Sequence, residues 1–222
     1  MGGMIPLGDA SRRLRTTAGG TLALIALNAW VFLLELQHGN RFVQEWAAVP
    51  VRITHGHAEI TVVTSMFLHA SWMHIIGNMV FLWAFGPAME DVMGHGRFLF
   101  FYLAGGIVAM LAQVYGDPFS RIACLGASGA IAAVMGAFIV TFPRDRIRTL
   151  LFFLIFVRIT YIPAVFLIGF WFLIQVLDYG VIAEARTGGV AYMAHIGGFL
   201  FGVILGRQFA DKKRLALRQF YG

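Results

Sequence analysis

Charged residues are scarce in this chain. Asp, Glu, Lys and Arg make up 13% of its 222 residues, against about 25% in an ordinary soluble domain. Apolar residues (Ala, Val, Ile, Leu, Met, Phe, Trp, Tyr and Cys) reach 59%, and the mean hydropathy is +0.77. This composition argues against a soluble globular domain and predicts an integral membrane protein.

Cysteine is almost absent. The single cysteine, Cys124, excludes an internal disulfide framework. A metal site built from His69, His74 and His195 would lack any carboxylate or cysteine ligand, and the sequence contains no His-Glu-x-x-His motif. We therefore expect neither a metal nor a cofactor.

Six apolar stretches approach the roughly 20 residues that a membrane-crossing helix needs. They run from Thr21 to Leu36, His74 to Ala88, Phe98 to Val114, Leu125 to Phe142, Thr160 to Leu177 and Ala191 to Gly206. No internal repeat divides them, so we predict one domain over residues 21–206 with a long outer loop at about 37–73. Residues 1–20 would then form a short amino-terminal segment. Residues 207–222 would form a basic tail.

Basic residues lie mainly on one side of these stretches. One side holds only four basic residues, Arg41, Arg52, Arg121 and Arg186. The opposite side holds the other 13 of the 17 Lys and Arg residues. The positive-inside rule then places both termini in the cytoplasm. The net charge of +6 is explained by this orientation, so no nucleic-acid partner is expected.

The second, fourth and sixth stretches all begin at the outer face, and each carries unusual polar residues in its first turns. These residues are His74 and Asn78, Ser128, and His195. At about 1.5 Å per residue, a residue three to five positions into a stretch would lie roughly 5 to 8 Å below the outer boundary, where water has access. A transporter would instead need polar residues through both leaflets, whereas the inner halves here are nearly all apolar.

Small residues predict that the fourth and sixth helices pack together. Ser128, Ala132 and Gly136 share one helix face, and Gly198, Gly202 and Gly206 form a matching stripe. Such stripes let two helices approach closely in lipid, which would bring Ser128 beside His195. The alternative is that the stripes only pack helices, that the serine bonds a carbonyl one turn back, and that the histidines and Asn78 link helices.

A hydroxyl beside an imidazole is the minimum equipment for nucleophilic acyl transfer. Gly126 and Gly129 permit a tight turn and close approach of a substrate backbone, and the Ser128 amide would lie at a helix amino terminus, which favours negative charge. His74 and Asn78, one turn apart, could donate to the same oxyanion. No acidic residue falls at matching depth on these three helices, although Asp178 lies near the outer end of the fifth, so a dyad is favoured over a triad.

Three motifs together resemble the rhomboid intramembrane serine proteases. They are His69-Ala-Ser-Trp-Met-His74-Ile-Ile-Gly-Asn78, Gly126-Ala-Ser128-Gly129, and Ala194-His195-Ile-Gly-Gly198 followed by Gly202. The resemblance implies an all-α bundle of six transmembrane helices in which Ser128 is the nucleophile and His195 the general base and then acid. It also implies that His74, Asn78 and the Ser128 amide, next to the Gly126 backbone, form the oxyanion hole.

The resemblance carries further expectations. Glu90 would have a structural role, and the segment from Pro163 to Leu177, with Phe166, Phe170 and Trp171, would gate lateral substrate access. The Trp-Arg pair that many family members carry in the first outer loop is missing here and would fall near Ile60-Thr61.

The function expected from these observations is hydrolysis of peptide bonds in or near transmembrane segments. The partners would be single-span or multi-span membrane-protein substrates and membrane lipid, and the location a bacterial inner membrane. The alternative is a catalytically inactive rhomboid-like protein that binds and retains membrane proteins, although Ser128 and His195 are both present.

Overall fold

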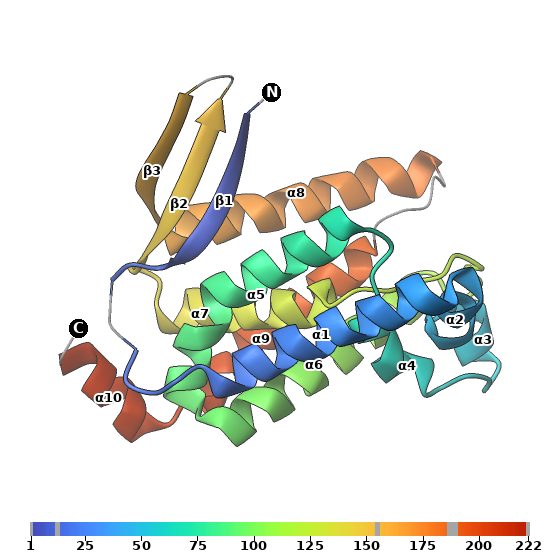
Figure 1. Cartoon of the computed structure of the whole chain (residues 1–222), viewed down its shortest axis with the longest axis horizontal. Helices are drawn as coiled ribbons and strands as arrows, with labels where there is room; N and C mark the ends of the chain where they lie inside the picture. The colour runs from blue at the N-terminus through green and yellow to red at the C-terminus, as the bar shows by residue number, and fades with distance from the viewer. Residues whose placement is uncertain (1, 12–13, 154–155, 186–190, 221–222) are drawn as a thin grey trace.

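The computed structural model describes residues 2–11, 14–153, 156–185 and 191–220, and most of these are helical. Each of the six apolar stretches lies wholly or mostly inside one helix (Figure 1): α1 (Gly19–His38), α5 (Trp72–Met93), α6 (His95–Gly116), α7 (Ser128–Thr141), α8 (Ala164–Ala185) and α9 (Tyr192–Phe209). Among the described residues, α1 and α6 are long and apolar enough to cross a membrane by length and composition. Ser128–Thr141 and Ala164–Leu177 form shorter apolar helices.

A three-stranded antiparallel sheet stands at one end of the helices, so the prediction of an all-α fold was wrong in this region (Figure 1). The strands are ordered β1 (Gly2–Asp9), β2 (Arg146–Phe153) and β3 (Phe156–Pro163). Strand β2 was not predicted because it does not form a long continuous apolar stretch. Its residues from Arg146 to Thr149 instead alternate between exposed and buried side chains, with a period of two. Because β3 takes up Thr160–Pro163, the fifth apolar helix begins at Ala164 instead of Thr160.

Helix α7 lies at the centre of the molecule, and all of its residues from Gly129 to Phe138 are buried. Its most extensive packing partner is α9. The three glycines of the α9 stripe lie against α7 so closely that a side chain on any of them would overlap it: Gly198 against Gly129, Gly202 against Ala133, and Gly206 against Ala137. These three α7 residues each follow a residue of the predicted row Ser128, Ala132 and Gly136, and Gly136 itself lies against Phe199 of α9.

Buried carboxylates tie α1 to the rest of the fold near both of its ends. Glu90 of α5 accepts hydrogen bonds from the backbone N–H groups of Gly20 (2.6 Å) and Thr21 (2.8 Å) and from the Thr21 hydroxyl (2.7 Å). It therefore satisfies donors in the first turn of α1 that have no partner within the helix. At the other end, Glu35 accepts from the backbone N–H of His69 at 3.0 and 3.1 Å, which anchors the loop just before α5.

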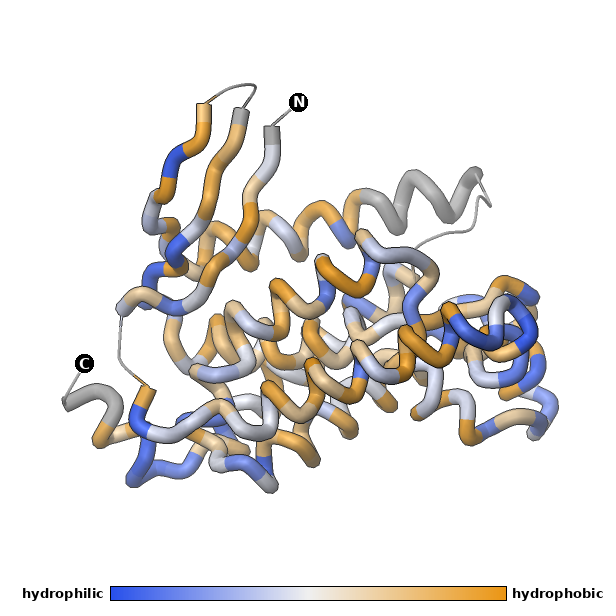
Figure 2. Tube along the Cα trace, in the orientation of Figure 1, coloured by the Kyte–Doolittle hydropathy of each residue, from blue (hydrophilic) through white to orange (hydrophobic). Residues whose placement is uncertain are grey.

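The loop between α1 and α5 is mostly helical. It contains α2 (Asn40–Trp46), α3 (Pro50–Thr54), α4 (Thr61–Thr64) and the 3-10 helix η1 (Ser65–Phe67). At the position of the missing Trp-Arg pair, Ile60 is exposed and Thr61 is buried. The tail forms α10 (Lys212–Phe220). Figure 2 shows hydrophilic residues gathered around α2 and α3 and at the opposite end near α10, with mostly hydrophobic helix segments between them.

Candidate active site

Ser128 and His195 meet where α7 and α9 begin. Ser128 is the first residue of α7 and His195 the fourth of α9. Although 67 residues separate them in sequence, the Ser128 Oγ lies 2.7 Å from the His195 Nε2. The small residues of the two helices allow this contact, since they bring the helix backbones together one turn further along. The serine is half-buried and the histidine is 9% exposed.

The other ring nitrogen of His195 contacts a residue that the sequence motifs did not reveal. Nδ1 lies 2.6 Å from Oε1 of Gln175, a buried residue of α8. The ring of Trp171, one helical turn earlier on α8, lies 5.6 Å from the His195 ring. Gln175 could have been noticed as the one polar amide in the apolar segment Ala164–Leu177, but no motif connects it to His195. The side chain of Asp178 lies outside the described residues.

His74 and Asn78 converge on the turn that precedes Ser128. His74 lies in the first turn of α5, where its N–H donates to the Ser71 hydroxyl at 3.2 Å, and Asn78 lies one turn later. Gly126 has a φ of +125°, and a Cβ at this position would lie 2.8 Å from Cε1 and 2.9 Å from Nε2 of His74 and 3.7 Å from Nδ2 of Asn78. Gly126 is therefore required both by its backbone conformation and by the space that the two side chains occupy.

Two hydrogen-bonding details make these side chains suitable donors. The backbone N–H of Ala70 donates to Nδ1 of His74 at 3.4 Å, so the neutral ring carries its proton on Nε2, which faces Gly126. Nδ2 of Asn78 is buried and has no hydrogen-bond partner among the described residues. A buried amide left without an acceptor is costly, and such groups are common where a ligand completes the site.

The imidazole of His69 lies beside that of His74, with ring centroids 5.1 Å apart. Burial, with a smaller contribution from His74, lowers the pKa of His69 to about 4, so this ring is neutral at pH 7. The described residues contain no group of three or more His, Cys, Asp or Glu side chains that could hold a metal ion.

The three residues expected to gate substrate access differ in their surroundings. Phe166 and Phe170 are 69% and 53% exposed on the outside of α8, while Trp171 packs against His195.

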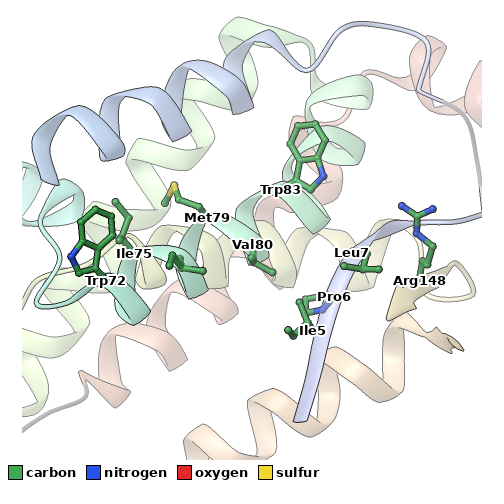
Figure 3. Close-up of a pocket in the computed structure, with 10 residues that line it drawn as sticks. Ile5, Pro6, Leu7, Trp72, Ile75, Met79, Val80, Trp83 and Arg148 are labelled. Carbon is green, nitrogen blue, oxygen red and sulfur yellow. The ribbon is translucent and has the colours of Figure 1, made fainter. Parts of the chain in front are cut away.

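An apolar groove of about 600 Å³ lies between β1 and α5 (Figure 3), and neither Ser128 nor His195 lines it. Its lining includes Ile5, Pro6 and Leu7 of β1 and Trp72, Met79 and Trp83 of α5.

Comparisons with known proteins agree with this arrangement. A model of the rhomboid domain matches residues 57–212. Rhomboid protein 1, mitochondrial, of Saccharomyces cerevisiae is 30% identical over 191 residues, which cover 83% of this chain and 51% of that protein. Rhomboid protease GluP of Bacillus subtilis is 30% identical over 193 residues, which cover 84% of this chain and 34% of that protein.

A third relative is the human presenilin-associated rhomboid-like protein, mitochondrial, which is 28% identical over 147 residues, or 63% of this chain and 35% of that protein. The chain thus spans about half or less of the length of these curated relatives. Since they include mitochondrial proteins as well as one from Bacillus subtilis, the expected bacterial inner membrane is not supported.

Proposed function

Because this chain belongs to the rhomboid family, we propose that it is an intramembrane serine endopeptidase that uses Ser128 as nucleophile and His195 as general base. Members of this family are integral membrane proteins, and so is this chain. The observation that carries the proposal is the 2.7 Å contact between the Ser128 Oγ and the His195 Nε2. An Oγ within hydrogen-bond reach of an imidazole nitrogen is the arrangement that activates a serine.

In the proposed arrangement, α1, α5, α6, α7, α8 and α9 cross the membrane and both termini lie in the cytoplasm. Residues 21–206 would form the protease domain, with residues 1–20 and 207–222 on the cytoplasmic side. The excess of basic residues on that side supports this orientation. The hydrophilic residues at both ends of the helices and the hydrophobic segments between them in Figure 2 support the crossing itself.

The reaction would proceed in two halves. Ser128 Oγ attacks the carbonyl carbon of the scissile peptide bond while its proton passes to Nε2 of His195. The tetrahedral intermediate then collapses, His195 gives that proton to the leaving amine, and an ester to Ser128 remains. In the second half, water loses a proton to His195 and attacks the ester, and the serine recovers the proton when the acid product leaves.

The oxyanion of both tetrahedral intermediates would form beside Gly126. The backbone N–H of Ser128, Nε2–H of His74 and Nδ2–H of Asn78 are the proposed donors. The protonation of His74 on Nε2 and the unpartnered amide of Asn78 support this assignment. A serine at the first position of α7 also places its own N–H at the positive end of the helix.

The proposed substrates are single-span or multi-span membrane proteins with helix-breaking small residues near the outer end of a transmembrane segment. An intact helix hides its carbonyl groups in intrahelical hydrogen bonds, so only an unwound peptide bond can be attacked. The half-buried position of Ser128 near the helix starts is compatible with such a bond and with water.

The test is cleavage of a model single-span protein by the purified chain in detergent, compared with Ser128→Ala and His195→Ala. We expect cleavage and labelling by a serine-directed fluorophosphonate only when both residues are present. Cleavage that persists in Ser128→Ala would overturn the proposal. Stable binding of the single-span protein without cleavage or labelling would instead favour the inactive, client-binding alternative.

A further inference from the structure

Gln175 lies on the side of His195 opposite to Ser128. The glutamine Oε1 is 2.6 Å from the histidine Nδ1, and both side chains are buried, at 8% and 9% exposure. We infer that Gln175 is a positioning residue that fixes the tautomer and the orientation of the His195 imidazole. This inference rests on the proposed protease function and adds a third, uncharged member to its dyad.

A long hydrogen bond within its own helix supports the orientation of the glutamine amide. Nε2 of Gln175 donates to the backbone carbonyl of Trp171 at 3.5 Å, one turn back along α8. With the amide nitrogen directed to that carbonyl, the oxygen is the atom that faces His195. An amide oxygen can only accept a hydrogen bond, so Nδ1 of His195 must carry the proton.

This tautomer is the one that general-base catalysis requires. With the proton on Nδ1, Nε2 presents a lone pair to the Ser128 hydroxyl at 2.7 Å. The opposite tautomer would present an N–H there and could not accept the serine proton. When His195 becomes an imidazolium during attack, the Nδ1–H bond to the glutamine becomes charge-assisted and therefore stronger. Gln175 would thus stabilise the transition state more than the ground state.

Among the described residues, the groups that neighbour His195 do not offer a substitute for Gln175. From α5, His74 is the titratable side chain near His195, and the Nε2 of its neutral ring faces Gly126. From α6, Gln113 uses its Oε1 to accept from the backbone N–H of Ala194, the residue before His195, at 3.2 Å. From α8, the Trp171 ring packs on His195 without a hydrogen bond to it among those of the described residues.

The experiment compares full-length wild type with Gln175→Leu, Gln175→Glu and the control Gln113→Leu, all purified in detergent. Gln113 is matched because it is also a glutamine, on a neighbouring helix, that accepts a hydrogen bond at the start of α9. For each protein, kcat, KM and the fluorophosphonate labelling rate of Ser128 are measured from about pH 5.5 to about pH 9, which brackets the ordinary histidine range. If Gln175→Leu does not fold, Gln175→Met, whose thioether sulfur is only a weak acceptor, takes its place.

Gln175→Leu is expected to lower kcat and the labelling rate by about 10- to 100-fold with little change in KM, the range for one hydrogen bond to a charged group. Gln175→Glu should restore most of this rate. It should also raise the pH of half-maximal activity, because a carboxylate stabilises the imidazolium, which cannot act as a base. Gln113→Leu should leave the rate and its pH dependence close to wild type.

Three results would overturn the inference while wild type remains active: a rate for Gln175→Leu close to wild type, an equal loss in Gln113→Leu, or no recovery in Gln175→Glu. A wild-type protein that neither cleaves nor labels would overturn the proposed function, and the role of Gln175 with it.

Discussion

At the scale of single residues, the buried amide of Asn78 gives the sharpest test of the oxyanion hole. Asn78→Ala should lower kcat by about 10²- to 10³-fold with little change in KM, because the donor acts on charge that develops in the transition state. Asn28 of α1 is the matched control, since it is another buried asparagine in an apolar helix and its Nδ2 donates to the Leu24 carbonyl at 2.7 Å.

Steady-state kinetics on a single-span protein separate the two variants. Asn28→Ala should lower thermal stability and leave kcat close to wild type. An unchanged kcat in folded Asn78→Ala would remove Asn78 from the oxyanion hole and leave the roles of Ser128 and His195 standing.

The lone thiol of Cys124 predicts a pH dependence of stability. Burial, together with the nearby charge of Asp117, raises the pKa of Cys124 from 9.0 to about 11. A raised pKa means that the folded state holds the proton more tightly, so this contribution is complete below pH 9 and is lost as the pH rises toward 11. The full contribution is about 3 kcal/mol, since one pKa unit corresponds to about 1.4 kcal/mol, and about 2 kcal/mol of it should be lost by pH 11.

This prediction is checked by thermal unfolding of wild type and Cys124→Ala at about pH 8 and about pH 11. The variant lacks only the thiol, so every other titrating group contributes equally to both proteins. The wild type should lose more stability than the variant over this interval. Equal losses in the two proteins would show that the thiol is accessible to water.

At the scale of elements, the close approach of α7 and α9 is the feature on which the site depends. A Cβ on Gly202 would overlap the backbone carbonyl of Ala133, which cannot move aside independently of its helix. Gly202→Ala should therefore separate the helices, destabilise the protein by about 1 to 3 kcal/mol and reduce cleavage by displacing Ser128 from His195.

The matched control is Gly169→Ala on α8, because a Cβ there meets no atom within 4 Å. This variant should be neutral or more stable by up to about 1 kcal/mol, the difference in helix propensity. Melting temperature and fluorophosphonate labelling compare the two. A Gly202→Ala protein as stable and as reactive as Gly169→Ala would refute the packing argument.

Sequence reasoning located helices better than it located the sheet or the third partner of His195. Long apolar stretches identify helices because the signal accumulates over many residues, and a serine or histidine inside one stands out. The strand β2 was missed because its period of two covers only a few residues, and one of its two partners, β1, is far away in sequence. Gln175 was missed because its contact depends on the rotation and position of α8, which no local pattern encodes.

At the scale of the whole molecule, Glu90 links α1 to the rest of the fold. The rhomboid domain match begins at residue 57, so Glu90 lies inside the matched region and α1 lies before it. Glu90→Leu would leave the N–H groups of Gly20 and Thr21 buried without their acceptor, so stability should fall by at least about 3 kcal/mol. Glu45→Leu is the control, because Glu45 is exposed and should change stability by no more than about 0.5 kcal/mol. Equal melting temperatures for the two variants would show that α1 packs without the carboxylate.

The orientation of the whole molecule in its membrane can be tested with cysteines placed at its two ends. In a Cys124→Ala background, His57→Cys puts a thiol in the exposed loop between α3 and α4, and Lys212→Cys puts one at the exposed start of α10. A membrane-impermeant maleimide added to intact cells should label the first and not the second, because transferring the basic tail across the bilayer is strongly disfavoured. Opening the membrane should expose the second site, whereas labelling of Lys212→Cys in intact cells would reverse the proposed topology and with it the side on which substrates are cut.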